Sequence, residues 1–356
     1  MKVIAILLII LSHCTQTLEK FTDFQAPTTD IQLLILRFFR FDGQLGNIIF
    51  VIASSWFLLD SKKVKNNKAI QLALNSQVIS VGIMVVFVLS SLVLKFRINY
   101  SADFFLHNIF PDLFEQVWFI PTYIIFYLIH PYLNEMVHLL TQRGHFFACV
   151  FIFAFYGICG RPAFSRLMGF IMIFIVTAYV KKYCSSLYNT PKKCFLIWLI
   201  ATLLFIAAVI AKNFLAMKIA YFKSFPEMNE LTSVFLLPMM LSLFLVFLNL
   251  NFYNKFVNYL SSLSIFVYCI HENALVRETL RPRYYEFVID RFGDEYLLLY
   301  DLVLFVMLTI LSFLASSIYK AISQKTVDRI SVVLEKKITA FVTFLFRKTS
   351  NLSEHD

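Results

Sequence analysis

The chain has 356 residues, of which 59% are hydrophobic and 15% are charged, and its mean hydropathy is +0.73. Soluble domains carry roughly 25% charged residues, so this composition excludes a soluble globular protein and indicates a multi-pass membrane protein. The net charge of +10 does not indicate a nucleic-acid-binding protein, because the basic residues fall between and after the apolar segments instead of on one soluble face.

The first segment, residues 1–18, begins with Lys2, continues as an unbroken apolar run and ends in polar residues that include His13. In a helix these two residues lie about 16 Å apart along the axis, which places Lys2 at the cytoplasmic edge of the membrane and His13 past the midplane. An ionisable group at that depth is a candidate functional site. The alternative is a cleavable signal peptide, although a bulky histidine departs from the small residues that precede a cleavage site.

Nine further apolar segments follow, separated by clusters of Lys, Asp and Asn. They are long enough for helices that cross about 30 Å of hydrocarbon, and they lack the alternation of apolar and polar residues that membrane strands show. We therefore predict an all-α fold, a polytopic transmembrane helical bundle of about ten spans. In chain order, the predicted spans are residues 1–18, 44–59, 72–94, 117–132, 146–159, 167–180, 195–211, 234–250, 256–273 and 296–319.

The positions of the basic residues predict the topology. Lysine clusters within residues 62–68 and 181–193 mark the cytoplasmic side, and the alternation of spans then places both termini in the cytoplasm. Residues 1–319 are predicted to form one transmembrane domain. Residues 320–356 form a basic cytoplasmic tail whose spaced apolar residues predict an amphipathic helix on the inner leaflet. Before the second span, residues 31–41 are predicted to lie at the membrane interface.

Two histidines are predicted at similar depth in the outer half of the membrane, His13 in the first span and His271 in the ninth. Two imidazoles that face one cavity can take and return protons near neutral pH, as activation of a hydroxyl requires. For each of them the alternative is a histidine whose hydrogen bonds are satisfied by a neighbouring helix. For His130 the alternative is a bond to a backbone carbonyl that the adjacent Pro131 leaves free.

Arginines on the predicted outer side are more numerous than topology requires, and they are candidates for binding an anionic or sugar-phosphate substrate. Pairing with nearby acids and with lipid headgroups explains them equally well. These arginines are Arg37, Arg40, Arg161, Arg166, Arg277, Arg281 and Arg283, and the nearby acids are Asp42, Glu278, Glu286 and Asp290. The six cysteines are scattered singly with no metal-ligand spacing, and we predict no metal site.

Four stretches, in this order along the chain, resemble motifs of the acyltransferase family 3 membrane proteins. Lys2 stands eleven positions before His13, where the family has an Arg before a His. Residues 50–58, FVIASSWFL, resemble the family's F-x-x-x-S-G-[FY] segment. Residues 118–133, which run from WFIP to HPYL, resemble its W-F-[LI] segment that ends in a Pro. Residues 264–271, SIFVYCIH, are similar to its late S-x-x-x-Y-x-x-H.

The resemblance implies a ten-span enzyme that takes an acyl group, usually acetyl, from cytoplasmic acyl-CoA. The enzyme delivers that group to a hydroxyl of an extracytoplasmic glycan or of its lipid-linked precursor. The resemblance also implies that His13 is the essential residue, that His271 is the late histidine and that Lys2 occupies the place of the family Arg. Lys2 lacks the rigid fork of that Arg, and Ser55 replaces the usual Gly.

Our first hypothesis is a cell-surface polysaccharide O-acetyltransferase, located as a multi-pass protein in the bacterial cytoplasmic membrane, with acetyl-CoA as donor and no nucleic-acid partner. His13 then acts as a general base on the sugar hydroxyl or carries the acyl group as a nucleophile, with His271 as the second catalytic candidate. The residues predicted to bind acyl-CoA are Lys2, Lys62, Lys63, Lys65 and Lys68. The residues predicted to bind the acceptor are Arg37, Arg40, Arg161, Trp118 and Glu272.

Two other functions remain open. A polysaccharide polymerase or lipid-linked-oligosaccharide transporter has a similar number of spans, but such proteins show longer outer loops or helices broken by Gly and Pro in matched halves. This chain has 8 Gly and 9 Pro, and neither feature is evident. A non-catalytic membrane scaffold explains the hydrophobicity and nothing else.

Overall fold

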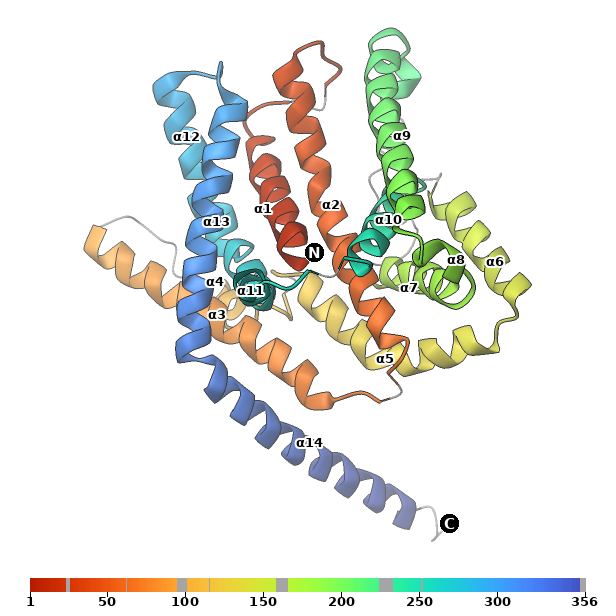
Figure 1. Ribbon diagram of the computed structural model, residues 1–356. Helices are drawn as coiled ribbons and strands as arrows, with labels where there is room; N and C mark the ends of the chain where they lie inside the picture. The colour runs from red at the N-terminus through yellow and green to blue at the C-terminus, as the bar shows by residue number, and fades with distance from the viewer. Residues whose placement is uncertain are drawn as a thin grey trace.

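The computed structural model describes residues 1–23, 26–61, 63–94, 101–114, 116–157, 166–223, 233–250 and 252–352. Within these ranges the chain forms helices, turns and loops but no strand, which confirms the predicted all-α class (Figure 1). In chain order the elements are α1 Lys2–Leu18, α2 Ile31–Leu58, α3 Asn66–Leu94, α4 Ala102–Ile109, α5 Phe119–Leu139, α6 Gln142–Phe151, η1 Ile152–Gly157, α7 Arg166–Tyr183, α8 Ser185–Tyr188, α9 Pro191–Lys218, η2 Ala220–Lys223, α10 Leu236–Leu248, α11 Lys255–His271, η3 Val276–Leu280, α12 Arg281–Phe292, α13 Leu297–Ile322 and α14 Gln324–Leu352.

Four of these helices, α2, α3, α9 and α13, are long and apolar enough to cross a membrane. The helix pair Phe119–Leu139 and Gln142–Ala154, bent by 118°, is a fifth candidate if it counts as one broken span. The other predicted spans coincide with shorter or less apolar helices. At about 1.5 Å per residue, the 13 residues of α10 are too short for a bilayer core of about 30 Å. The ten spans and the cytoplasmic termini therefore stay predictions.

Helix α2 is continuous through the region in which the sequence suggested a break. Its 28 residues join the predicted interfacial segment to the predicted second span. Asp30 caps its first turn by accepting a hydrogen bond of 2.8 Å from the backbone N–H of Gln32. The predicted break between residues 31–41 and the second span was wrong, because Gly43 stays inside the helix and lies against a neighbouring helix. The interfacial position of residues 31–41 stays a prediction.

Helix α1 packs on α2 through two glycines. A Cβ atom at Gly43 would lie 2.7 Å from Ser12 Oγ, and one at Gly46 would lie 2.4 Å from the carbonyl oxygen of Ala5. Small residues at such positions let two membrane helices approach closely. The Ser12 hydroxyl also donates a hydrogen bond of 2.7 Å to the carbonyl oxygen of Arg40. Helix α1 is thereby fixed between α2 and α13, in the middle of the fold (Figure 1).

We expect Gly46→Ala to destabilise the protein by about 1–3 kcal/mol, because the new methyl group meets a backbone carbonyl that cannot rotate away. Gly82→Ala is the matched control. Gly82 lies in α3 with open space around its Cβ position, so alanine there is expected to stabilise the helix by about 0.5–1 kcal/mol. Thermal unfolding in detergent measures both variants. Equal midpoints for the two variants would contradict the close packing of α1 on α2.

The C-terminal end of α2 is held by side chains from two other helices. Asn134 of α5 donates a hydrogen bond of 3.0 Å to the carbonyl oxygen of Leu58. Lys181 of α7 donates one of 2.6 Å to the carbonyl oxygen of Trp56. Carbonyl groups in the last turn of a helix have no partner within the helix, and cations are favourable there. These bonds fix the start of the lysine-rich loop that follows α2.

His130 satisfies a carbonyl group that Pro131 leaves free. Proline has no backbone N–H, so the carbonyl oxygen of Tyr127, four residues before Pro131, lacks its helical donor. His130 Nδ1 lies 2.6 Å from that oxygen and donates to it. The structural alternative predicted for His130 is therefore confirmed.

Candidate active site

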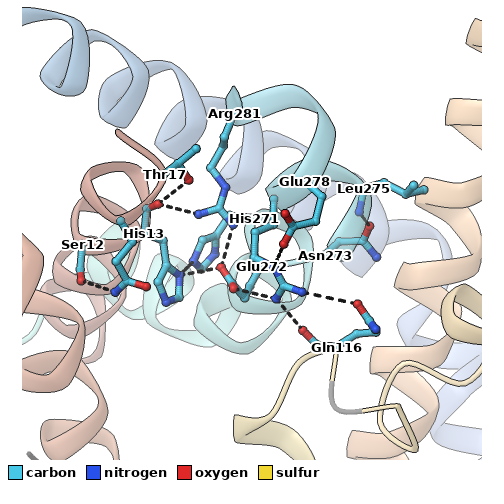
Figure 2. Close-up of polar contacts among 12 residues, drawn as sticks. Ser12, His13, Thr17, Gln116, His271, Glu272, Asn273, Leu275, Glu278 and Arg281 are labelled. Atoms are coloured by element: carbon cyan, nitrogen blue, oxygen red, sulfur yellow. Dashed lines mark hydrogen bonds and ion pairs between the residues drawn. The ribbon is translucent and has the colours of Figure 1, made fainter. Parts of the chain in front are cut away.

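His13 of α1 and His271 at the end of α11 lie in contact, although 258 positions separate them in the sequence. His13 Nδ1 is 3.1 Å from His271 Nε2 and 2.7 Å from Glu272 Oε2 (Figure 2). All three side chains are buried. The structure thus brings together both predicted catalytic histidines and adds a carboxylate to them.

The hydrogen bonds of this cluster determine which nitrogens carry hydrogen. His271 Nδ1 lies 2.7 Å from the carbonyl oxygen of Val267, so it is the donor, and Nε2 of a neutral His271 is an acceptor. An ionised Glu272 is likewise an acceptor. His13 Nδ1 therefore carries a hydrogen directed at these two acceptors, which leaves the lone pair of a neutral His13 on Nε2. None of the described residues forms a hydrogen bond with that nitrogen, so it is available for chemistry.

Two arginines hold Glu272 in its ionised, acceptor-only form. Arg281 Nη2 donates a hydrogen bond of 2.9 Å to Glu272 Oε2, and Arg277 Nη1 donates one of 3.0 Å to Oε1. Arg281 is 2% exposed and Glu272 is 6% exposed. A buried carboxylate persists only when such partners compensate its charge. The two guanidinium groups therefore favour a negative charge next to His13 Nδ1.

The two arginines also connect the histidine cluster to neighbouring segments. Arg281 Nη1 donates a hydrogen bond of 2.8 Å to the carbonyl oxygen of His13, so one guanidinium group contacts both His13 and Glu272 (Figure 2). Arg277 contacts the carbonyl oxygen of Gln116 at 3.0 Å and Glu278 at 2.8 Å. Burial raises the pKa of the Glu278 carboxyl, but hydrogen bonds from Arg277 and Lys20 outweigh burial and lower that pKa below its usual value.

A second buried network fixes the helical turn just after His13. The Tyr285 hydroxyl is 2.6 Å from Asp301 Oδ1 and 3.2 Å from the carbonyl oxygen of Cys14. The Thr15 hydroxyl is 2.8 Å from Asp301 Oδ2. Asp301 is fully buried, and its two oxygens join α12 and α13 to α1. This network therefore restricts rotation of α1 and helps to orient the His13 ring.

The same cluster has the composition of a metal site. His13, His271 and Glu272 each offer one ligand atom, and these atoms lie within 4.8 Å of one another, a donor set that Zn²⁺ accepts. Both oxygens of Glu272, however, already accept hydrogen bonds from guanidinium groups, whose positive charge opposes a divalent cation at the same place. The arrangement therefore favours a proton-transfer site over a metal site.

A cavity of about 820 Å³ lies between α1, α2, α3, α5 and α11. Its wall contains Lys2 and Lys68, two of the lysines predicted to bind acyl-CoA, together with Gln71, Asn75 and Tyr127. Most of the remaining lining is apolar, which is typical of small-molecule sites of this size. The structure therefore places two predicted donor-binding lysines at one cavity.

A second, narrower space of about 10 Å³ shares part of its lining with this cavity. Phe50, Phe119, Ser264 and Ile265 line both spaces, and Ile9, Asn47 and Tyr268 line the narrower one. Ile9 precedes His13 by four residues and so lies on the same face of α1, one turn away. Ser264 Oγ and Asn47 Oδ1 are buried and have no hydrogen-bond partner among the described residues. Such groups are suited to hydrogen-bond a polar ligand group beside them.

The other lysines predicted to bind the donor lie in the loop after α2. Lys63 and Lys65 are exposed, and the backbone N–H of Lys65 donates a hydrogen bond of 3.0 Å to the hydroxyl of Tyr127, which lines the cavity. Lys62 lies outside the described residues. The described part of this loop therefore borders the cavity.

The predicted acceptor-binding residues do not gather at one place. Arg37 is buried and donates hydrogen bonds to Asn213 and to the carbonyl oxygen of Ala26, and Arg40 pairs with Glu19 at 2.7 Å. Trp118 is half-buried, with the guanidinium carbon of Arg166 4.4 Å from its ring centroid. Arg161 lies outside the described residues. Glu272, assigned to the acceptor from sequence, lies against His13 instead.

Sequence reasoning did not place Arg281, Tyr285 or Asp301 at the site. Arg281 was predicted only as one of several outer arginines. The Arg277–Glu278 ion pair does match the alternative in which outer arginines pair with nearby acids. The partner of Arg281 is Glu272, nine positions earlier, and the intervening π-helix η3 brings the two together.

One protein-family model matches the part of the chain that contains this site. The family model described as an acyltransferase domain matches residues 1–321, which include both histidines, Glu272 and the donor-side lysines. Searches of curated proteins and of solved structures find no match. The match covers all of the site described above and ends before α14. The chain therefore belongs to the acyltransferase family 3 of membrane acyltransferases.

Proposed function

We propose that this membrane acyltransferase transfers an acetyl group from cytoplasmic acetyl-CoA to a hydroxyl of an extracytoplasmic cell-surface glycan or of its lipid-linked precursor. The observation that carries the proposal is the His13 ring, whose Nδ1 is bonded to a buried Glu272 while Nε2 has no hydrogen-bond partner among the described residues. An imidazole in this arrangement is a general base or a nucleophile, as in Ser-His-Asp sites.

On the donor side, Lys2 and Lys68 meet the phosphates of CoA, together with Lys62, Lys63 and Lys65 of the adjoining loop. The extended arm of CoA then lies in the cavity of about 820 Å³ and directs its thioester toward His13. From Lys2 to His13 the axial distance along α1 is about 16 Å, so the donor has to be a long molecule with its anionic end far from the reacting carbon.

In the reaction, the acceptor hydroxyl gives its proton to His13 Nε2 and its oxygen bonds to the thioester carbon. The carbon–sulfur bond then breaks, and the CoA thiolate takes the proton from Nε2. Glu272 stabilises the imidazolium that exists between these two steps. In the alternative route Nε2 attacks the thioester carbon first, the carbon–sulfur bond breaks and the CoA thiolate leaves. The acceptor hydroxyl then bonds to the acyl carbon and gives its proton to the thiolate, and the carbon–nitrogen bond breaks to regenerate His13.

On the acceptor side we propose that Trp118, Arg37, Arg40 and Arg161 guide a sugar substrate from outside, with the protein in the bacterial cytoplasmic membrane and both termini inside. Family membership favours acyl transfer over the polymerase or lipid-linked-oligosaccharide transporter alternative, because that family consists of acyltransferases. Besides acyl-CoA and the glycan, we propose membrane lipids as a partner of the chain.

Mass spectrometry of surface glycan and lipid-linked glycan tests the proposal. Cells that make the wild-type chain are compared with cells that make His13→Ala at equal membrane abundance and with cells that lack the chain. We expect acetyl esters on the glycan only in the first strain. Unchanged acetylation in the His13→Ala strain would contradict the proposal, and shorter glycans in place of unacetylated ones would favour the polymerase.

A further inference from the structure

Helix α14 follows directly after α13 and extends away from the rest of the fold (Figure 1). It lies outside residues 1–321, which match the acyltransferase family, so its role belongs to this chain and does not follow from family membership. Its first half packs along α3, and Val327 and Ser331 are buried there. The remaining faces of this half are exposed.

The exposed faces of α14 have two distinct compositions. An apolar stripe follows helical spacing with residues 45–62% exposed, namely Ile330, Val333, Phe341 and Phe344, and the exposed Lys337 stands among them. About a quarter of a turn from it runs an exposed basic row, namely Lys325, Arg329 and Lys336. An apolar face flanked by lysine and arginine is typical of a helix that lies in the headgroup region of an anionic membrane.

The acidic residues of this part of α14 lie on the side of the helix that faces α3. Asp328 accepts a hydrogen bond from the side chain of Gln71, and Glu335 accepts one of 3.2 Å from the backbone N–H of Asn67. Both carboxylates are half-buried, whereas the basic row is exposed. The charge that this part of α14 presents outward is therefore positive, which matches anionic lipid and opposes a basic partner.

The contacts of α14 reach the donor cavity. Gln71, the partner of Asp328, lines that cavity, and so does Asn75. Asn75 Oδ1 accepts a hydrogen bond of 2.5 Å from the hydroxyl of Tyr319, near the end of α13. Asn75 in turn donates a hydrogen bond of 2.7 Å to the carbonyl oxygen of Gln71. Displacement of α14 would therefore free the Gln71 side chain in the cavity wall, next to Asn75.

We propose that α14 binds the anionic lipid surface of the inner leaflet through its apolar stripe and basic row, and that this contact keeps the α3 wall of the donor cavity in place. The lipid contact is independent of the proposed function. The effect on acyl-CoA binding rests on the proposed function.

Hydrogen–deuterium exchange of the full chain in vesicles tests the lipid contact. Vesicles of phosphatidylcholine are compared with vesicles that contain phosphatidylglycerol, at low and high salt. Each basic residue near an anionic surface contributes about fivefold in affinity, so the charge reversal Lys325→Glu/Arg329→Glu/Lys336→Glu is expected to weaken the contact on the order of a hundredfold. The matched control, Lys192→Glu/Lys193→Glu/Lys255→Glu, changes net charge equally at exposed positions on the same predicted side.

In the native chain we expect amides of α14 to exchange several-fold more slowly in the anionic vesicles, and high salt to remove the difference. The charge-reversal variant of the basic row is expected to lose this difference in exchange between the two vesicle types, and the control variant is expected to keep it. Equal exchange in both vesicles, or equal loss in variant and control, would overturn the lipid contact.

The second readout is the KM for acetyl-CoA, which is expected to rise several-fold in the basic-row variant at unchanged kcat, with no change in the control. An unchanged KM beside the expected exchange result would overturn the coupling to the donor cavity alone. Absence of acetyl transfer by the native chain would instead contradict the proposed function and leave the exchange result intact.

Discussion

Replacement of His13 by Gln is expected to lower kcat for acetyl transfer by about 10³-fold or more, because general-base catalysis by a positioned group contributes about 10²–10⁴-fold. Glutamine fills a similar volume but cannot exchange protons near neutral pH. Transfer of labelled acetyl from acetyl-CoA to glycan by the protein in vesicles measures the loss. Binding of CoA, followed by calorimetry, is expected to stay within about twofold, because Lys2 lies about 16 Å away along α1.

His271→Gln is the matched comparison, since it changes the same residue type in the same cluster. Its Nδ1 is occupied by the carbonyl oxygen of Val267 and its Nε2 faces His13 Nδ1, so we assign His271 a positioning role. We expect a loss of about tenfold, well below that of His13→Gln. A larger loss in His271→Gln than in His13→Gln would reverse the assignment of the reactive nitrogen. A trapped acyl-protein in rapid-quench samples of the wild type would select the acyl-histidine route.

The features that sequence did predict are those set by local physics. Uninterrupted apolar runs predict helices, and Pro131 leaves a carbonyl free four residues earlier whatever the tertiary fold, so the partner of His130 followed from sequence. The axial distance between Lys2 and His13 also follows from helix geometry alone. Because two equal depths permit a contact without requiring one, the pairing of His13 with His271 was only a possibility.

The features that sequence did not predict depend on tertiary contacts. The dipeptide Asp42–Gly43 is a typical break signal, yet close packing against Ser12 keeps Gly43 inside α2. Glu272 follows His271 directly, but nothing local shows that its carboxylate turns toward α1. That orientation depends on Arg281, which reaches Glu272 only because η3 and α12 fold back over the end of α11.

Glu272→Gln is expected to lower kcat by about 10²–10⁴-fold although Glu272 need not touch the substrate. Glu272 Oε2 faces both His13 Nδ1 and Arg281 Nη2, so the amide oxygen of glutamine can keep both contacts while the amide nitrogen faces Arg277. The neutral amide no longer supplies the negative charge that stabilises the His13 imidazolium formed during the reaction. The corresponding change in Ser-His-Asp sites costs about 10⁴-fold, which sets the upper end of the expected loss.

The same substitution is also expected to lower stability, and a double variant separates this effect from the effect on catalysis. Glu272→Gln leaves the buried Arg281 charge without a counter-ion, and breaking a buried ion pair by removal of one partner costs about 3–5 kcal/mol. The double variant Glu272→Gln/Arg281→Met removes both charges and is expected to recover most of the thermal stability while kcat stays low. If kcat recovered together with stability, the loss in the single variant would be structural, and the negative charge of Glu272 would have no role in stabilising the His13 imidazolium.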